Sequence, residues 1–355
     1  MIKLAMGFMK YAIVLIVLVV VIAILILSIQ SVFAANSLDL GDNAKITRTV
    51  NVVTADCLFT TTKTTMKLEN DCTTDQTILI PDGFTLDGKR HTITAVDPSG
   101  GHFVDAVIKS QGATAHVKNL IVTTSNLNNV CDAGEDRLRG IMFEGASGSI
   151  IDNKVLAINQ GASGCQEGNA IEVRNAPFDG THPNTMTVEI AHNTVSDYQK
   201  TGIVSNGDVS VSIHHNKISS SATQVDLAAN SIQFGFGAAG TAEHNKVDGN
   251  QWCGSSDSAA TAILIFDADN VQVIKNDIGG NSDIGIYIAG DDVTVDENKV
   301  IDSSAIDCNQ FGYDIGIGNY GENNSINKNK VSGFDMPFDG DVGEKNKEKK
   351  AKLTN

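Results

Sequence analysis

The sequence is poor in the residues that fill the centre of an ordinary globular domain. Only 5% of its 355 residues are aromatic, tryptophan occurs once, and five prolines stand against 33 glycines. This composition does not suit a globule that is packed around large rings. It suits a stack of thin layers with a narrow interior.

Positive charge is also scarce. The chain has 26 lysines and arginines against 42 aspartates and glutamates, which gives a formal net charge of −16. Such an acidic body argues against nucleic acid or an anionic lipid surface as the partner. It is compatible with calcium binding, or with solubility alone.

Long apolar runs are absent except near the N-terminus. Lys3 and Lys10 precede an uncharged run at 11–27, and small residues up to Ala34 follow it. This order is typical of an export signal. We expect 1–34 to be a cleaved signal peptide or, because the run is nearly long enough to span a bilayer, a retained N-terminal membrane anchor. In either case the body is secreted or lies at the cell surface, and only this segment contacts the membrane.

A ten-residue phrase recurs seven times with asparagine in the sixth place; one copy is "VSIHHNKISS" at 211–220. The copies lie at 148–157, 188–197, 211–220, 240–249, 271–280, 293–302 and 324–333. A degenerate copy at 115–124 precedes them, and the asparagines are spaced by 22 to 40 residues. Internal repetition of this length predicts a solenoid.

The repeat has the period of a strand. The first and third places are apolar in most copies, and the eighth is always valine or isoleucine. A second short, β-rich run follows each phrase, as in "TGIVSNG" at 201–207, and no helix-length apolar period lies between them. Short strands without hairpin signals or crossover helices predict coils stacked in register, which is a parallel β-helix.

The pattern V-x-I-x-x-N-x-[VI] followed by G-I-x-[VI], together with the segment at 78–96, resembles the right-handed parallel β-helix superfamily of pectate-lyase-like proteins. The resemblance covers about residues 75–335. It implies an all-β, single-stranded right-handed parallel β-helix (solenoid) at 76–338. A cap region at 35–75 precedes it, and a disordered lysine-rich tail at 339–355 follows. The superfamily includes polysaccharide lyases, glycoside hydrolases, epimerases and tailspikes.

The repeated asparagine has a structural explanation. Equivalent residues of a β-helix stack about 4.8 Å apart, so buried amides can bond to each other and to the backbone. Asparagine also tolerates the conformation of a tight turn. We therefore expect an internal ladder formed by Asn153, Asn193, Asn216, Asn245, Asn276, Asn298 and Asn329.

Six cysteines in an exported protein predict disulfides. Cys131 and Cys165 each lie 12 residues after the asparagine position of adjacent copies, so they fall in the same loop of neighbouring coils. Cys253 and Cys308 fall in the equivalent loop of later coils, and Cys57 and Cys72 remain for the N-terminal region. The expected pairs are Cys57–Cys72, Cys131–Cys165 and Cys253–Cys308.

The fifth place of the phrase forms an exterior column that includes His192, His215 and His244. Imidazole is a common metal ligand. However, a straight column offers its ligands from one side, and the charge along it changes sign as on a solvated edge. A surface stripe is therefore the favoured interpretation, and a metal site is the alternative.

Long insertions precede the second strand of several repeats, at 125–138, 159–168, 248–258 and 303–313. Loops that wall one sheet create a trough, and functional residues favour such loops. The side chains expected to point outward into it include Glu144, Glu172 and Arg174 as candidate catalytic groups, and Gln233, Phe266, Tyr287 and Tyr320 as candidate saccharide contacts. Glu144 and Glu172 would act as acid and base if their carboxyl groups were about 5–10 Å apart.

Paired acids at a turn, Asp291 and Asp292, are candidate calcium ligands, although turns prefer such residues in any case. The hydrolases of the superfamily carry Gly-His-Gly and Arg-x-Lys motifs, which are absent here. If the protein is an enzyme, the resemblance implies a polysaccharide lyase, epimerase or glycoside hydrolase, with calcium as an optional ion and no required cofactor.

The favoured function is binding of, or action on, polysaccharide along the walled sheet. A non-catalytic structural or adhesive protein of the cell envelope is the alternative, and a metal-handling protein that uses the histidine column is the third. The insertions on one face favour the first, because a purely structural solenoid would not need them. The expected partner is a polysaccharide or another envelope polymer.

Overall fold

The structure, a computed structural model, describes residues 57–175, 186–222, 224, 227–254, 258–303 and 311–349. All of them belong to one compact unit. The predicted export signal or anchor at 1–34 lies outside the described residues. Within those residues, no helix is both long and apolar enough to cross a membrane.

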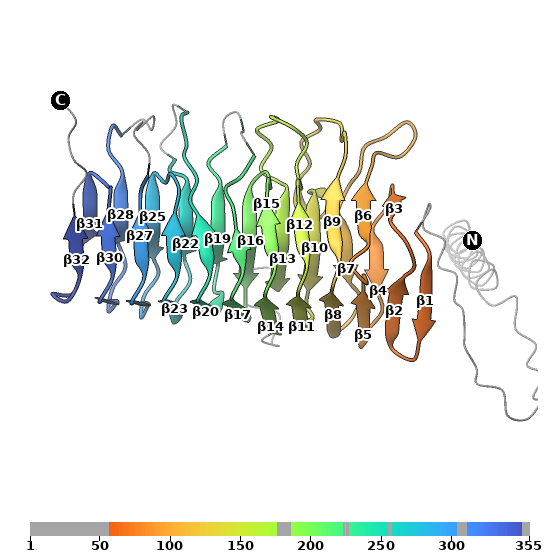
Figure 1. Cartoon of the computed structure of the whole chain (residues 1–355), viewed down its shortest axis with the longest axis horizontal. Coiled ribbons are helices and arrows are strands. Elements are labelled where there is room, and N and C mark those ends of the chain that lie inside the picture. The colour runs from red at the N-terminus through yellow and green to blue at the C-terminus, as the bar shows by residue number, and fades with distance from the viewer. Residues whose placement is uncertain are drawn as a thin grey trace, which may run out of the picture. The chain divides into compact units, whose positions relative to one another are not determined.

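Nearly every element is a short strand, and the strands form three sheets that run along the unit (Figure 1). Sheet 1 contains, in spatial order, β1 Phe59–Thr62, β2 Thr65–Leu68, β5 Phe84–Asp87, β8 Thr114–Lys118, β11 Ser147–Ile151, β14 Met186–Ala191, β17 Val209–His214, β20 Ala239–Glu243, β23 Val271–Ile274, β26 Thr294–Asp296 and β29 Ser325–Asn327. Sheet 2 contains β3 Cys72–Thr74, β6 Thr92–Ala95, β9 Ile121–Thr124, β12 Lys154–Leu156, β15 Thr194–Ser196, β18 Lys217–Ile218, β21 Lys246–Asp248, β24 Asp277–Gly279, β27 Lys299–Ile301, β30 Lys330–Ser332 and β32 Lys347–Lys349.

Sheet 3 carries the trough on its outward face. It contains β4 Ile78–Ile80, β7 Ala106–Ser110, β10 Arg139–Glu144, β13 Asn169–Asn175, β16 Thr201–Gly207, β19 Asn230–Gly235, β22 Thr261–Phe266, β25 Ile284–Ala289, β28 Ile315–Asn319 and β31 Met336–Gly340. The helical element of the described residues is a 3-10 turn, η1 Gly134–Asp136. The longer loops connect sheet 2 to sheet 3 and project from one side of the stack, at the top of Figure 1.

One coil of the chain passes once through each sheet, and the next coil lies beside it in parallel register. Ile190 thus pairs with Ile213 in sheet 1, and Val195 pairs with Ile218 in sheet 2. Such apolar residues are fully buried, because period-two alternation turns every second side chain toward the interior. The predicted parallel β-helix is therefore confirmed.

The expected asparagine ladder is present inside the coils. In Asn245, Oδ1 accepts hydrogen bonds from the backbone N–H and from Nδ2 of Asn216, at 2.9 and 3.0 Å. Its Nδ2 donates to the carbonyl of Ile213 and to Oδ1 of Asn276, at 2.9 and 3.0 Å. Amide-to-amide bonds of this kind join successive members from Asn153 to Asn329.

The corner beside the ladder is formed by the fifth place of the phrase. The residues there have φ between 54° and 59°, in the left-handed region: Asp152, His192, His215, His244, Lys275, Glu297 and Lys328. The expectation that the asparagine itself takes the turn conformation is therefore wrong. The residue before it turns the chain, which directs its own side chain outward and the asparagine inward.

The ladder begins at Asn153, as predicted. The degenerate copy at 115–124 is in register with 148–157, since Ala115 pairs with Gly148. Asn119 therefore occupies the left-handed fifth place, and the backbone N–H of Leu120 in the sixth place donates to Asn153. At the other end the ladder is longer than predicted, because Asn346 accepts from Asn329 and donates to the carbonyl of Ile326.

The solenoid also extends further than predicted. β2 and β3 already pair in parallel with β5 and β6, so coils begin before the expected boundary at residue 76. Only β1 departs from this pattern, because it pairs with β2 as an antiparallel hairpin. At the C-terminus, β32 pairs with β30, which corrects the expectation of a disordered tail from residue 339. Residues 350–355 lie outside the described residues.

Two of the expected disulfides are present, Cys57–Cys72 and Cys131–Cys165. The second was predicted by counting from Asn119, which lies one place earlier in its copy than the asparagines of the other copies. The pairing is still correct, because a loop position tolerates an error of one residue. Cys253 is also disulfide-bonded. Its predicted partner, Cys308, lies outside the described residues.

Candidate functional site

The outward face of sheet 3 carries the predicted column in register. Met142, Glu172, Val204, Gln233, Leu264 and Tyr287 lie side by side on successive strands. Met142, Glu172 and Val204 are nonetheless buried, whereas the column is partly accessible from Gln233 onward. The trough therefore has a covered end at β10–β16 and an open end at β19–β28.

The covered end contains an ion-pair cluster, formed by the cations Lys109, Arg139 and Arg174 and the carboxylates Asp105, Glu135, Glu144 and Glu172. Within it, Oε2 of Glu172 accepts from Nε of Arg139 at 2.7 Å and from Nδ2 of Asn169 at 2.8 Å. Its Oε1 lies 3.7 Å from Nη1 of Arg174. Arg139 also donates to carbonyls of the 134–137 segment, which fastens that loop over the cluster.

The three predicted catalytic residues are brought together in this ion-pair cluster. Glu172 is 3% exposed, and each of its oxygens faces a guanidinium. Arg174 contacts Glu135 and lies 2.8 Å from Glu144. The burial and pairing of Glu172 do not favour direct contact with a substrate, and catalysis by Glu144, Glu172 and Arg174 stays a prediction.

The open end contains an aromatic cleft with a volume of about 380 Å³. Its rings are those of Phe266, Tyr287, Phe311, Tyr313 and Tyr320, which come from β22, β25 and the segments on either side of β28. Leu264, Ile284, Ile315, Thr261 and Asp283 complete the lining with Ala259. Three of the five tyrosines in the chain thus meet at one place on sheet 3.

The rings of the aromatic cleft are packed against each other. The centroids of Tyr287 and Tyr320 are 5.0 Å apart, and those of Phe311 and Tyr313 are 6.3 Å apart. Tyr320 folds back over Gly318, where a Cβ atom would come within 2.7 Å of the tyrosine Oη. The Tyr320 hydroxyl donates to Asp339 at 2.9 Å. Burial, followed by this contact with Asp339, raises the pKa of Tyr320 above its usual value.

Of the four predicted saccharide contacts, Phe266, Tyr287 and Tyr320 line the cleft. Gln233 lies in the adjacent coil beside Leu264, where it bonds to Asn230 and Asn206. Sequence reasoning missed Phe311 and Tyr313, since they lie in a loop whose path the repeat does not define. It also missed Phe236, whose ring is 5.9 Å from that of Phe266.

The carboxyl group of Asp314 anchors the loop that carries Phe311 and Tyr313. Its Oδ1 accepts from the backbone N–H of Asp335 at 2.6 Å, and the side chain is hydrogen-bonded to Asp302. Burial, then the neighbouring acids Asp302 and Asp335, raises the pKa of Asp314 to about 7 from 3.8. The folded protein therefore holds a proton on the hydrogen-bonded pair of Asp314 and Asp302 at a pH where the unfolded chain does not.

We expect this proton to make stability depend on pH. Because the pKa is raised on folding, the contribution is fully present below about pH 4 and is lost as the pH rises through 7. Asp314→Asn should keep the bonds of the protonated acid. Its thermal midpoint should therefore fall less between pH 5 and pH 8 than that of the wild type. The exposed Asp277→Asn is the control, and an unchanged pH profile in Asp314→Asn would contradict the assignment.

Asp291 and Asp292 lie at a turn and take part in its contacts. Oδ1 of Asp291 accepts from the backbone N–H of Glu322 at 2.7 Å, and its own N–H donates to Asp269 at 2.8 Å. Asp292 adopts a left-handed conformation with φ 55°. These contacts join neighbouring coils, and calcium binding by Asp291 and Asp292 stays a prediction.

The predicted histidine column is present on the exterior beside the ladder. The ring centroids of His192 and His215 are 5.2 Å apart, and those of His215 and His244 are 5.3 Å apart, with both pairs stacked. His214, which sequence reasoning left out, lies beside the column. Among the described residues, the cluster that could hold a metal ion consists of His192, His214 and His215.

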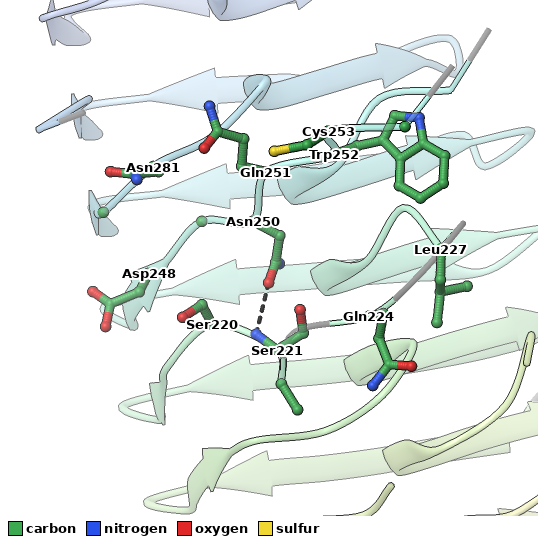
Figure 2. Close-up of a pocket in the computed structure, with 14 residues that line it drawn as sticks. Ser220, Ser221, Gln224, Leu227, Asp248, Asn250, Gln251, Trp252, Cys253 and Asn281 are labelled. Atoms are coloured by element: carbon green, nitrogen blue, oxygen red, sulfur yellow. Dashed lines mark hydrogen bonds between the residues drawn. The ribbon is translucent and has the colours of Figure 1, made fainter. Parts of the chain in front are cut away.

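A larger polar pocket of about 700 Å³ lies between the loops that follow β18, β21 and β24 (Figure 2). Its lining includes Ser221, Asp248, Asn250 and the single tryptophan, Trp252. Oδ1 of Asn250 accepts from the backbone N–H of Ser221 at 2.7 Å. None of the predicted catalytic or saccharide-binding residues lines this pocket.

One family model agrees with this architecture. Residues 181–340 match the family described as "Right handed beta helix region". No curated protein sequence shows a significant match to the chain.

Several solved structures resemble the protein. The periplasmic alginate epimerase AlgG superposes with a TM-score of 0.46 at 11% identity, over 81% of this chain and 78% of that one. The Dettilon tailspike protein superposes with a TM-score of 0.42 at 14% identity, over 75% of this chain and 55% of that one. A mutant DFA-IIIase from Arthrobacter chlorophenolicus A6 superposes with a TM-score of 0.44 at 10% identity, over 79% of this chain and 72% of that one. These similarities bear on neither activity nor ligand. The predicted resemblance and the predicted fold class, a right-handed parallel β-helix, are confirmed.

Proposed function

We propose that the protein binds a neutral polysaccharide outside the cytoplasm, along the aromatic cleft of sheet 3. The observation that carries the proposal is the gathering of five rings in one cavity of a chain that is only 5% aromatic. Phe266, Phe311, Tyr313 and Tyr320 are all exposed. An exposed apolar patch of this kind is characteristic of a ligand-binding groove, and the flat rings match the C–H faces of a sugar.

The charge of the cleft favours a neutral chain over a polyanion. Among the described lining residues, Asp283 is the charged side chain, and no lysine or arginine is present. Asp339 lies at the edge through its bond to Tyr320. A uronate polymer would therefore meet negative charge from the cleft and from a chain of net charge −16. The disulfides and the predicted export signal support a location outside the cytoplasm.

We expect Phe266→Ala and Tyr287→Ala each to weaken binding by at least about tenfold, or about 1.4 kcal/mol. The reason is that each substitution removes one stacking surface. Affinity electrophoresis against soluble mannan, xylan and β-glucan, with alginate and polygalacturonate for comparison, measures the effect. Tyr287→Phe keeps the ring, so it separates stacking from hydrogen bonding by the hydroxyl.

Leu79→Ala is the matched control for these variants. Leu79 lies in β4 at the far end of the same sheet, and it is 46% exposed, as are Phe266 and Tyr320. The mobility of Leu79→Ala should equal that of the wild type in every gel. If the wild type binds none of the polymers, the proposal is contradicted, and a structural or adhesive role in the envelope becomes the better explanation.

A further inference from the structure

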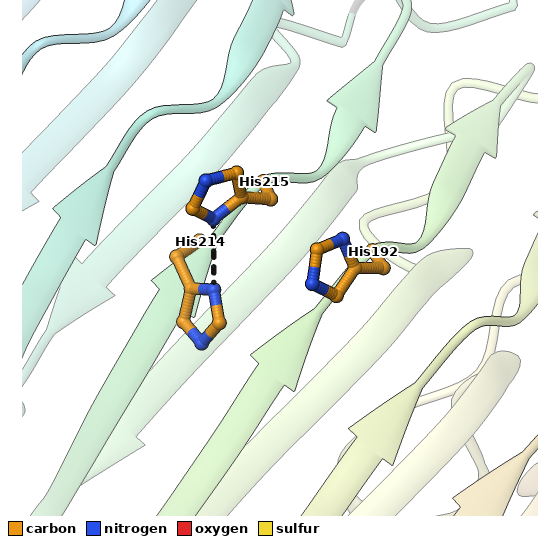
Figure 3. A group of neighbouring side chains, drawn as sticks. All are labelled: His192, His214 and His215. Carbon is orange, nitrogen blue, oxygen red and sulfur yellow. Dashed lines mark hydrogen bonds between the residues drawn. The ribbon is translucent and has the colours of Figure 1, made fainter.

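The histidine cluster lies at a corner where the chain geometry makes imidazoles converge. His192 and His215 occupy the left-handed fifth place on adjacent coils, with φ 57° and 55°. Equivalent corners are one coil apart, which brings their rings to 5.2 Å. His214 comes from the fourth place, at the end of β17, and is opposite the small Ala191. Its ring is therefore close to both column members, at centroid distances of 5.9 and 5.3 Å (Figure 3).

The hydrogen bonds of His214 indicate which of its nitrogens holds the lone pair. Nε2 lies 3.1 Å from Oε1 of Glu189, a carboxylate that can only accept, so Nε2 carries the proton. The lone pair of neutral His214 is then on Nδ1, which accepts a hydrogen bond from Nδ1 of His215 at 3.1 Å. A metal ion bound between these two nitrogens would replace that proton, which moves to Nε2 of His215 or to solvent. A carboxylate behind a ligating imidazole is the usual support of a metal-bound histidine, because it fixes the ring and its tautomer.

The separation of His214 and His215 matches that of two ligands in a coordination shell. One nitrogen from each of His192, His214 and His215 lies within 4.8 Å of the others. Two imidazole nitrogens on a tetrahedral ion at about 2.0–2.1 Å are roughly 3.3 Å apart. The His214–His215 pair is already near that distance, and the exposed His192 can close the remainder by rotating its side chain.

We propose that His192, His214 and His215 form a binding site for one divalent transition-metal ion such as Zn²⁺ or Cu²⁺. Three imidazoles select these ions over Ca²⁺, which requires oxygen ligands. The site lies on the corner between sheets 1 and 2, whereas the aromatic cleft belongs to the outward face of sheet 3. It is therefore independent of saccharide binding.

The test uses the untagged protein, because a histidine tag would bind the same ions. Zn²⁺ is titrated in competition with a chromophoric chelator, and Cu²⁺ is followed by its EPR spectrum for nitrogen ligation. We expect one ion per chain and a loss of about tenfold or more in affinity for His192→Asn, His214→Asn and His215→Asn. Asparagine suits the left-handed corner that His192 and His215 occupy, so these two variants should retain the fold.

His116→Asn is the matched control. His116 lies in β8 of the same sheet, bonded to Ser149 and outside the cluster. Its affinity for Zn²⁺ should equal that of the wild type, and millimolar Ca²⁺ should not compete. Failure of the wild type to bind Zn²⁺ or Cu²⁺ stoichiometrically would overturn the proposal, as would equal affinities for wild type and His215→Asn.

Discussion

Replacing Asn245 by alanine is expected to lower the free energy of unfolding by about 4 kcal/mol. The substitution removes four buried hydrogen bonds, two accepted from Asn216 and two donated to Ile213 and Asn276. Each buried group left without a partner costs about 1–3 kcal/mol, and Asn245 is 2% exposed.

Two measurements check this result. Chemical denaturation gives the overall cost, and hydrogen exchange at the backbone N–H of Asn216 gives the local one, since that group donates directly to Asn245. The local readout is needed because repeat proteins unfold through neighbouring units, not always as a whole. Asn70→Ala at an exposed position should cost less than about 0.5 kcal/mol. A similar small cost at Asn245, with unchanged exchange, would show that the ladder does not stabilise the coils.

Replacing Glu172 by leucine is expected to cost about 3–5 kcal/mol. The substitution leaves the guanidinium of Arg139, which is 3% exposed, without its carboxylate partner at 2.7 Å. An exposed pair with a similar separation, Lys299–Asp277 at 2.8 Å, should contribute less than about 1 kcal/mol. The contrast between Glu172→Leu and Asp277→Leu isolates burial as the cause.

A double-mutant cycle separates the ion pair from the packing of its two side chains. We expect Arg139→Met combined with Glu172→Leu to be less destabilised than the sum of the single variants, by about 2 kcal/mol. The measurement is the free energy of unfolding of all four proteins. Additive effects would mean that Arg139 and Glu172 are not coupled. In that case Glu172 would again be a candidate for a role at the surface of the trough.

The alternation of the second strands predicted much of the aromatic cleft. Phe266 and Tyr287 face outward because period two alone decides the side of a strand to which each residue points. Phe311 and Tyr313 could not be placed in the same way, because they lie in a connection without any period. The surroundings of Glu172 were likewise not predictable, since its partner Arg139 is bonded to a loop that is more than thirty residues away from Glu172 in sequence.

The histidines illustrate the same division. The repeat predicted the column of His192, His215 and His244, and it suggested that a column presents its ligands from one side. The structure adds His214, which enters from the neighbouring position because Ala191 leaves space for it. Convergence of three rings depends on this side-by-side packing, which the spacing within one copy does not reveal.

The sequence by itself determined the path of each coil. Every coil contacts its nearest neighbours through the same few places of the phrase, and a local period that is repeated many times specifies those places. The apolar alternation, the inward asparagine and the stacking axis follow from that. Only the tertiary structure decided where the solenoid ends, which half of the trough is covered and which rings and imidazoles meet. These features depend on insertions that differ from coil to coil, so their positions are set by packing and charge pairing across the stack, not by the repeat.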